Sequence, residues 1–162
     1  MTSEVFRVMQ LRIARWLIEY DPEATRRCFA QIPVGTGCEC AQCRNFDLAV
    51  NRAFPEQFVA LAEDLGVDIA KPAELCHYCR EASGLYLTGG WFHFAGSILD
   101  GEDVLQWSGS GGTYRFEELV PGLEFGFGAR LALVPQVFQS APLTQLEFQT
   151  RLPWVLTEPE PG

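Results

Sequence analysis

Residues 85–99 read Leu-Tyr-Leu-Thr-Gly-Gly-Trp-Phe-His-Phe-Ala-Gly-Ser-Ile-Leu, and this stretch is the clearest indication of the fold class. It consists of two apolar, aromatic-rich runs on either side of Gly89-Gly90. A glycine pair between two such runs is typical of a tight hairpin turn. We therefore expect one strand over residues 85–88 and a second over residues 91–99.

The second run also predicts how its side chains divide between the two faces of a sheet. Successive side chains of a strand point to opposite faces, so Trp91 and His93 share one face while Phe92 and Phe94 share the other. One of these faces belongs to the core. The other could line a binding pocket with Trp91 and His93, although a histidine satisfied within the sheet is the simpler interpretation.

Further strands are expected on both sides of this stretch. Residues 9–20 change their alternation midway, which favours a strand with a bulge over a helix. Alternation is cleanest from Leu146 to Leu152, which predicts a late strand. Shorter strands are expected over residues 104–107, 123–127 and 129–134, with a flexible loop over residues 108–112.

Helix signals are confined to the first half of the chain. Asp21-Pro22-Glu23 combines an N-cap residue, a first-turn proline and a first-turn acid, and predicts a helix that ends near Gln31. A second helix is expected over residues 45–52. A third should begin at Pro55 and stop at Gly66.

These elements predict one α+β domain over residues 1–162, with a mostly antiparallel sheet packed by two or three helices. A chain of 162 residues fits one domain. We expect the tail over residues 158–162 to be frayed.

Charge and composition narrow the classes of partner. The net charge is −9, and an acidic surface repels phosphate, which argues against nucleic acid and anionic membranes. A basic protein partner would suit it, although solubility alone also explains the charge. The sequence shows neither a signal peptide nor a membrane span, so we expect a cytoplasmic protein whose six cysteines are reduced thiols or metal ligands.

The cysteines fall into two motifs. Cys38, Cys40 and Cys43 form C-E-C-A-Q-C, and Cys76 and Cys79 form C-H-Y-C. Two C-x-x-C pairs can supply four thiolates to a tetrahedral Zn²⁺, with Cys38 as a spare ligand or His77 in place of one sulfur. Unligated thiols packed as small hydrophobes are an equal alternative, and an iron–sulfur cluster or a redox dithiol are lesser ones.

Other catalytic signatures are sparse. The chain has two histidines, and a Cys79–His93 nucleophilic pair has no local support. The Gly109-Ser110-Gly111 segment lacks the spacing of a nucleophile elbow and the lysine of a phosphate loop. We therefore favour a non-catalytic binding protein, steadied by zinc, over a thiol-dependent enzyme or redox protein. An immunity-type protein that neutralises a basic toxin, or a structural module, would also fit.

Four segments together resemble a family of small uncharacterised bacterial proteins. They are the C-x-C-x-x-C-R-N-[FY] segment at residues 38–46, the P-x-x-F helix that ends in L-G-V-D at residue 68, the G-G-W-F-H-F strand at residues 89–94 and the Q-L-E-F strand at residues 145–148. The resemblance implies a bacterial cytosolic protein. It implies that a shared binding role would rest on Arg44 and Asn45 beside the first three cysteines, and it does not extend to Cys76 and Cys79.

Overall fold

The structure is a computed structural model that describes residues 8–139 and 142–161. Its strands are β1 (Met9–Ile13), β2 (Trp16–Tyr20), β3 (Glu74–Arg80), β4 (Tyr86–Asp100), β5 (Leu105–Ser108), β6 (Gly111–Tyr114), β7 (Glu117–Val120), β8 (Leu123–Gly128) and β9 (Leu143–Leu152). Its helices are α1 (Pro22–Phe29), α2 (Ala41–Ala53) and α3 (Glu56–Leu65).

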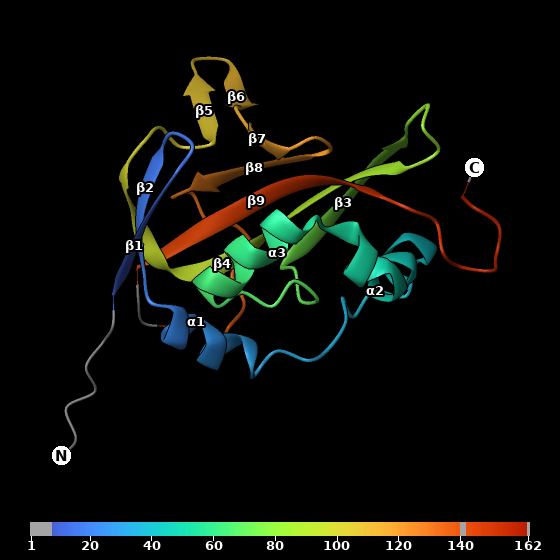
Figure 1. The fold of residues 1–162 in the computed structure, drawn as a ribbon, viewed down its shortest axis with the longest axis horizontal. Helices are drawn as coiled ribbons and strands as arrows, with labels where there is room; N and C mark the ends of the chain where they lie inside the picture. Colours follow the sequence, from blue (N-terminus) through green and yellow to red (C-terminus); the bar gives the residue numbers. More distant parts are fainter. Residues whose placement is uncertain (1–7, 140–141, 162) are drawn as a thin grey trace.

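Seven of the described strands form one antiparallel sheet in the order β1-β2-β4-β9-β8-β7, with β3 beside the first half of β4. Strands β5 and β6 form a separate hairpin. Figure 1 shows the helices gathered along β4 and β9, while the β5–β6 hairpin stands away from them at the top of the view. This arrangement confirms the predicted α+β class with a mostly antiparallel sheet.

Helices α2 and α3 pack against one face of the long strands through a cluster of phenylalanines. Phe54 lies 5.0 Å from Phe148 and 4.9 Å from Phe58, measured between ring centroids, and Phe148 stacks on Phe92 at 5.4 Å. Burial of each such ring contributes roughly 1.5–3 kcal/mol to folding. Phe92 and Phe94 are fully buried, which confirms that they share a core face.

Helix α1 closes a gap along the edge of β4. Strand β3 pairs with residues 86–91 of β4 and β2 pairs with residues 96–100, which leaves residues 92–95 without a strand partner on this edge, although β9 pairs with them on the other side. There the amide of Ala95 donates to Thr25 Oγ1 at 3.0 Å, and the amide of Asp21 donates to the Ala95 carbonyl at 2.9 Å. The edge is therefore satisfied by the helix and its cap.

The face of the sheet opposite α2 and α3 is called the outer face here. Its residues include Trp91 and His93 of β4 and their register partners Glu147 and Gln145 of β9. This face is covered in part by chain outside the sheet, because Trp91 Nε1 donates to the Ala132 carbonyl at 2.9 Å. Polar residues on it are consequently buried.

The predicted hairpin at Gly89-Gly90 is wrong, because β4 runs through both glycines without a turn. The absence of a side chain serves packing instead. A Cβ atom on Gly90 would lie 2.2 Å from the Glu74 carbonyl oxygen of β3 and 3.0 Å from the Phe148 ring. Glycine within a strand often marks such a close approach.

Residues 9–20 form a hairpin instead of one bulged strand. Ala14, at the turn between β1 and β2, has a φ of +49°. The expected loop at residues 108–112 lies within the β5–β6 hairpin, and residues 129–134 do not form the expected strand.

The three expected helices are present, and two of their predicted end signals are confirmed. Asp21 caps α1 by accepting from the Ala24 amide at 3.0 Å, and Gly66 ends α3 with a φ of +83°. Helix α2 begins four residues earlier than expected, at Ala41. None of the helices in the described residues has the length and apolar character needed to cross a membrane.

The C-terminal segment, expected to be frayed, makes side-chain contacts up to Glu160. Arg44 Nη2 donates to Glu158 Oε2 at 3.2 Å, and the Tyr86 hydroxyl donates to Glu160 Oε2 at 2.9 Å. Both contacts anchor the segment beside α2 and β4. Gly162 lies outside the described residues.

Candidate functional site

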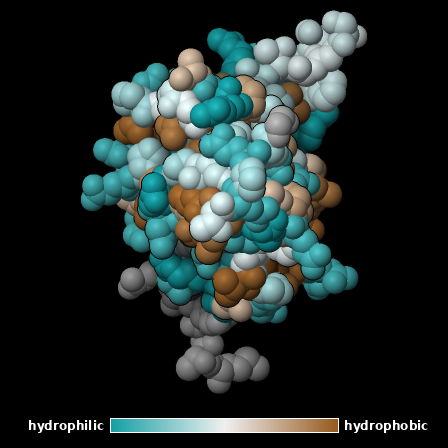
Figure 2. Space-filling view, turned by 90° about the vertical axis from the view of Figure 1, so that its right-hand side faces the viewer, coloured by the Kyte–Doolittle hydropathy of each residue, from teal (hydrophilic) through white to brown (hydrophobic). Residues whose placement is uncertain are grey.

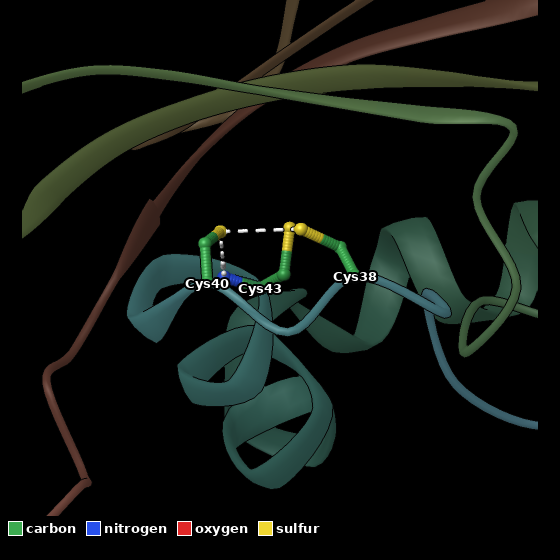
Figure 3. Close-up of side chains that lie close together, drawn as sticks. All are labelled: Cys38, Cys40 and Cys43. Atoms are coloured by element: carbon green, nitrogen blue, oxygen red, sulfur yellow. Dashed lines mark hydrogen bonds between the residues drawn. The ribbon is translucent and has the colours of Figure 1, made fainter.

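Three cysteines converge at the N-terminus of α2. Cys38 and Cys40 precede the helix, Cys43 lies in its first turn, and one ligand atom from each lies within 4.8 Å of the others. Figure 3 shows the three side chains pointing toward one another above the first turn of the helix. The Cys38 and Cys40 sulfurs are 3.3 Å apart. Such a group of soft donors suits Zn²⁺.

Local hydrogen bonds hold the loop that carries these cysteines. Cys40 is the N-cap of α2, and its sulfur accepts from the Cys43 amide at 3.4 Å. Two residues before Cys38, Thr36 is tied to Asp47 of α2 by its amide at 3.1 Å and its hydroxyl at 3.2 Å. The loop is therefore fixed at both ends against the helix that presents Cys43.

A histidine from the sheet approaches one sulfur of the group. His77 of β3 places Nε2 3.6 Å from Cys43 Sγ. It pairs in register with Thr88, which is fully buried, whereas the Cys76 position faces the other side of the sheet. A sulfur and an imidazole nitrogen bound to one tetrahedral zinc lie about 3.6 Å apart, because Zn–S is about 2.3 Å and Zn–N about 2.0–2.1 Å. The distance between His77 and Cys43 fits this value, whereas the His77 nitrogen does not lie within 4.8 Å of all three sulfurs, so four-fold ligation requires the imidazole to move toward Cys38 and Cys40.

Hydrogen bonding and desolvation shift the pKa values of Cys40, Cys43 and His77 in different directions. The backbone N–H of Cys43 is the main cause that lowers the pKa of the Cys40 thiol, whereas burial raises the pKa of Cys43. Desolvation also lowers the pKa of His77, although the residue is exposed, and this direction favours the neutral imidazole. A thiolate and a neutral imidazole are the forms that bind a metal ion.

The structure does not bring Cys76 and Cys79 into this group, contrary to the predicted pairing of the two motifs. Cys76 pairs with Gly89, and after a register shift Cys79 pairs with Leu87, so both lie on the outer-face side of β3. His77, between them in sequence, faces the helices. Strand alternation therefore sends the sulfurs away from α2 and the imidazole toward it.

Arg44 and Asn45, the two predicted binding residues beside the cluster, are engaged by the C-terminal segment. The Arg44 guanidinium forms an ion pair with Glu158 and donates to the Glu39 carbonyl at 3.0 Å. Asn45 is buried, donates to the Pro153 carbonyl at 3.0 Å and accepts from the Val155 amide at 2.7 Å. Asn45 therefore has a packing role in this structure.

Trp91 and His93, the other two predicted binding residues, lie on the outer face and apart from the cysteine cluster. His93 is 1% exposed, its Nε2 lies 3.0 Å from Gln145 Oε1, and burial lowers its pKa. Its Nδ1 has no hydrogen-bond partner among the described residues. A nucleophilic pair of His93 with Cys79 is not formed, because His93 is enclosed and bonded to Gln145.

Glu147 is a buried residue that the sequence analysis did not single out. It is 5% exposed, and its Oε1 accepts from Gln145 Nε2 at 2.8 Å. In the sequence it occupies a polar position of an alternating strand, which ordinarily faces water. Its burial depends on distant chain that covers the outer face, and no local pattern indicates that cover.

No family model, curated protein or solved structure matches this chain. The geometry of its own residues is therefore the basis for assigning a function.

Proposed function

We propose that this chain is a non-catalytic binding protein in which Cys38, Cys40, Cys43 and His77 hold one structural Zn²⁺. The observation that carries the proposal is the 3.6 Å approach of His77 Nε2 to Cys43 Sγ beside two further sulfurs. Three thiolates and one imidazole form a closed tetrahedral set, which leaves no position for a reactive water. Such a centre stabilises a fold and does not by itself catalyse a reaction.

The centre would join two parts of the fold that meet only in three dimensions. Cys43 belongs to α2 and His77 to β3, and 34 positions separate them in sequence. A bound ion would fix the start of α2 against the sheet and order the loop that carries Cys38. A reducing compartment such as the bacterial cytoplasm would keep the thiols available.

The partner would be a protein. A partner with a basic surface would best complement the net charge of −9. Figure 2 shows one side of the molecule, where hydrophobic residues form small separate patches among hydrophilic residues. Recognition on that side would therefore rely on polar and charged contacts. A neutralising protein of the immunity type is one class with these properties.

Metal analysis tests the zinc centre directly. Protein purified with a reductant and without chelator should contain about one zinc per chain, and a chelator should expose three further reactive thiols. Metal-free protein with the same fold and the same thiol reactivity before and after chelator would refute the centre.

A second candidate function is thiol–disulfide exchange, which the 3.3 Å contact of the Cys38 and Cys40 sulfurs favours. The Cys40 thiolate would attack a disulfide of a partner protein and release one partner thiolate. Cys38 would then attack the Cys40 sulfur in the mixed disulfide and release the second. Two electrons and the two cysteine protons would pass to the partner, leaving a Cys38–Cys40 disulfide. Reduction of a disulfide substrate by metal-free protein, lost in Cys38→Ser, would distinguish this function.

A further inference from the structure

The carboxylate of Glu147 is buried on the outer face with half of its hydrogen-bonding capacity unused. Its Oε1 accepts from Gln145, whereas Oε2 has no partner with hydrogen-bond geometry among the described residues and is closed off from solvent. The Tyr114 hydroxyl is near enough to lower the pKa of this carboxyl. A buried polar oxygen without a partner costs free energy, and proteins contain few of them. Such an oxygen therefore needs an explanation in terms of function.

Two small cavities adjoin this carboxylate. Each has a volume of about 80 Å³, and both are lined by Glu147, Trp91 and Tyr114. Tyr78 lines one of them and Asp103 lines the other. These volumes exceed the ~30 Å³ share of a water molecule in the liquid. They are far below the roughly 300 Å³ of a drug-sized site, so the ligand must be a small group.

The charge around the cavities is predominantly negative. Asp103 adds a second carboxylate, whose oxygens accept from the amides of Leu105 and Ala129 at 2.9 and 2.7 Å. Arg130 lines the cavity that Asp103 lines, and its guanidinium stacks over Trp107 at 4.5 Å, whereas the residues lining the Tyr78 cavity include no cation. Because Glu147 Oε2 has no ion-pair partner there, the complementary ligand is a cation.

The walls favour an organic cation over a metal ion. Indole and phenol rings attract ammonium groups through their π faces, and Trp91, Tyr78 and Tyr114 provide three such rings. Mg²⁺ and Ca²⁺ require about six or more oxygen ligands, which one free carboxylate oxygen among aromatic rings does not supply. A compact cation with a methyl-covered surface would match a negative charge beside three aromatic rings.

We propose that the cavity lined by Tyr78 binds a small alkylammonium group, whose positive charge is balanced by the buried Glu147 carboxylate while its methyl groups contact Trp91, Tyr78 and Tyr114. The group can be a free amine or the head group of a larger ligand. The site shares no residue with the zinc centre, and neither proposal depends on the other.

Titration with trimethylammonium chloride tests the proposal, with the indole N–H signal of Trp91 in a ¹H–¹⁵N NMR spectrum as the readout. Trp91→Phe identifies that signal by its loss and keeps an aromatic ring in place. Saturable shifts in the millimolar range are expected. The neutral probe tert-butanol, of similar shape, should bind at least about tenfold more weakly, because it carries no charge for the carboxylate and the rings.

Glu147→Gln keeps the shape of the side chain and removes its charge, so affinity for trimethylammonium should fall at least about tenfold. Glu118→Gln removes the same charge from an exposed position of β7 and should change affinity less than about twofold. Absence of saturable binding to the folded protein, equal binding of tert-butanol, or unchanged affinity in Glu147→Gln would each overturn the proposal.

Discussion

Cys43 Sγ and His77 Nε2 lie 3.6 Å apart, although the first belongs to a helix and the second to a strand of the sheet. The contact forms because His77 is the residue of the C-H-Y-C motif that faces the helices. The proposed zinc centre therefore uses the histidine of this motif and neither of its two cysteines. The expected pairing of two C-x-x-C motifs is wrong because the sulfurs of Cys76 and Cys79 lie on the side of β3 that faces away from α2.

His77→Ala should lower zinc affinity at least about tenfold, because it removes one of four ligands. Cys43→Ser should act in the same direction. Metal content after dialysis against a graded series of chelator concentrations measures both effects. The matched controls Cys76→Ser and Cys79→Ser should retain wild-type zinc content, and loss of zinc in these controls with retention in His77→Ala would contradict the assignment.

Gly90→Ala should destabilise the fold by about 1–3 kcal/mol, because its Cβ would lie 2.2 Å from the Glu74 carbonyl oxygen. Urea unfolding measures the change in the free energy of unfolding. Gly109→Ala is the matched control, since a Cβ there meets no atom within 4 Å, and it should shift stability by less than about 0.5 kcal/mol. Equal effects of the two substitutions would contradict the close packing of β3 on β4.

Asn45→Ala should cost about 1–3 kcal/mol of stability, because it leaves the Pro153 carbonyl and the Val155 amide without their partner. Asn51→Ala, at an exposed position of the same helix, should be neutral or slightly stabilising. Thermal unfolding compares the two variants. A neutral Asn45→Ala would show that the C-terminal segment does not depend on this residue.

Glu147 should make stability depend on pH. Burial raises the pKa of its carboxyl, the hydrogen bond from Gln145 opposes this shift, and Asp103 adds to it. Tyr114 also lowers this pKa, and Arg130 is the cation that lines the same cavity. In sum, the pKa in the folded state lies above its value in the unfolded chain, which is about 4.3.

Between these two pKa values the folded state binds more protons than the unfolded state, so the free energy of unfolding falls as the pH rises. Glu147→Gln should abolish this fall and be more stable than wild type at neutral pH. Urea unfolding at a series of pH values provides the measurement, and Glu118→Gln should keep the wild-type profile. Parallel profiles for wild type and Glu147→Gln would contradict a raised pKa.

The resemblance to a bacterial family and the first three cysteines both pointed to the region around residues 38–46. The structure supports that focus for the cysteines, which converge because they lie within one loop and one helical turn. It gives Arg44 and Asn45 partners in the C-terminal segment, more than one hundred residues away. Contacts of that range leave no trace in local spacing.

The features that sequence alone determined are those whose physics is local. Asp21 caps α1 within three residues, Gly66 supplies the left-handed turn that ends α3, and alternation separates Phe92 and Phe94 from Trp91 and His93. Each depends on the conformational preferences of a few neighbouring residues. These local preferences were sufficient for the fold class.

Tertiary structure alone decided what each face of the sheet contacts. A glycine pair permits a turn or a close approach, and only the position of β3 selects the latter at Gly90. The direction of His77 depends on strand register, and the burial of Glu147 depends on chain that folds over the outer face. Both candidate sites arise from such long-range packing, because their ligand groups come from segments that the sequence separates and the sheet brings together.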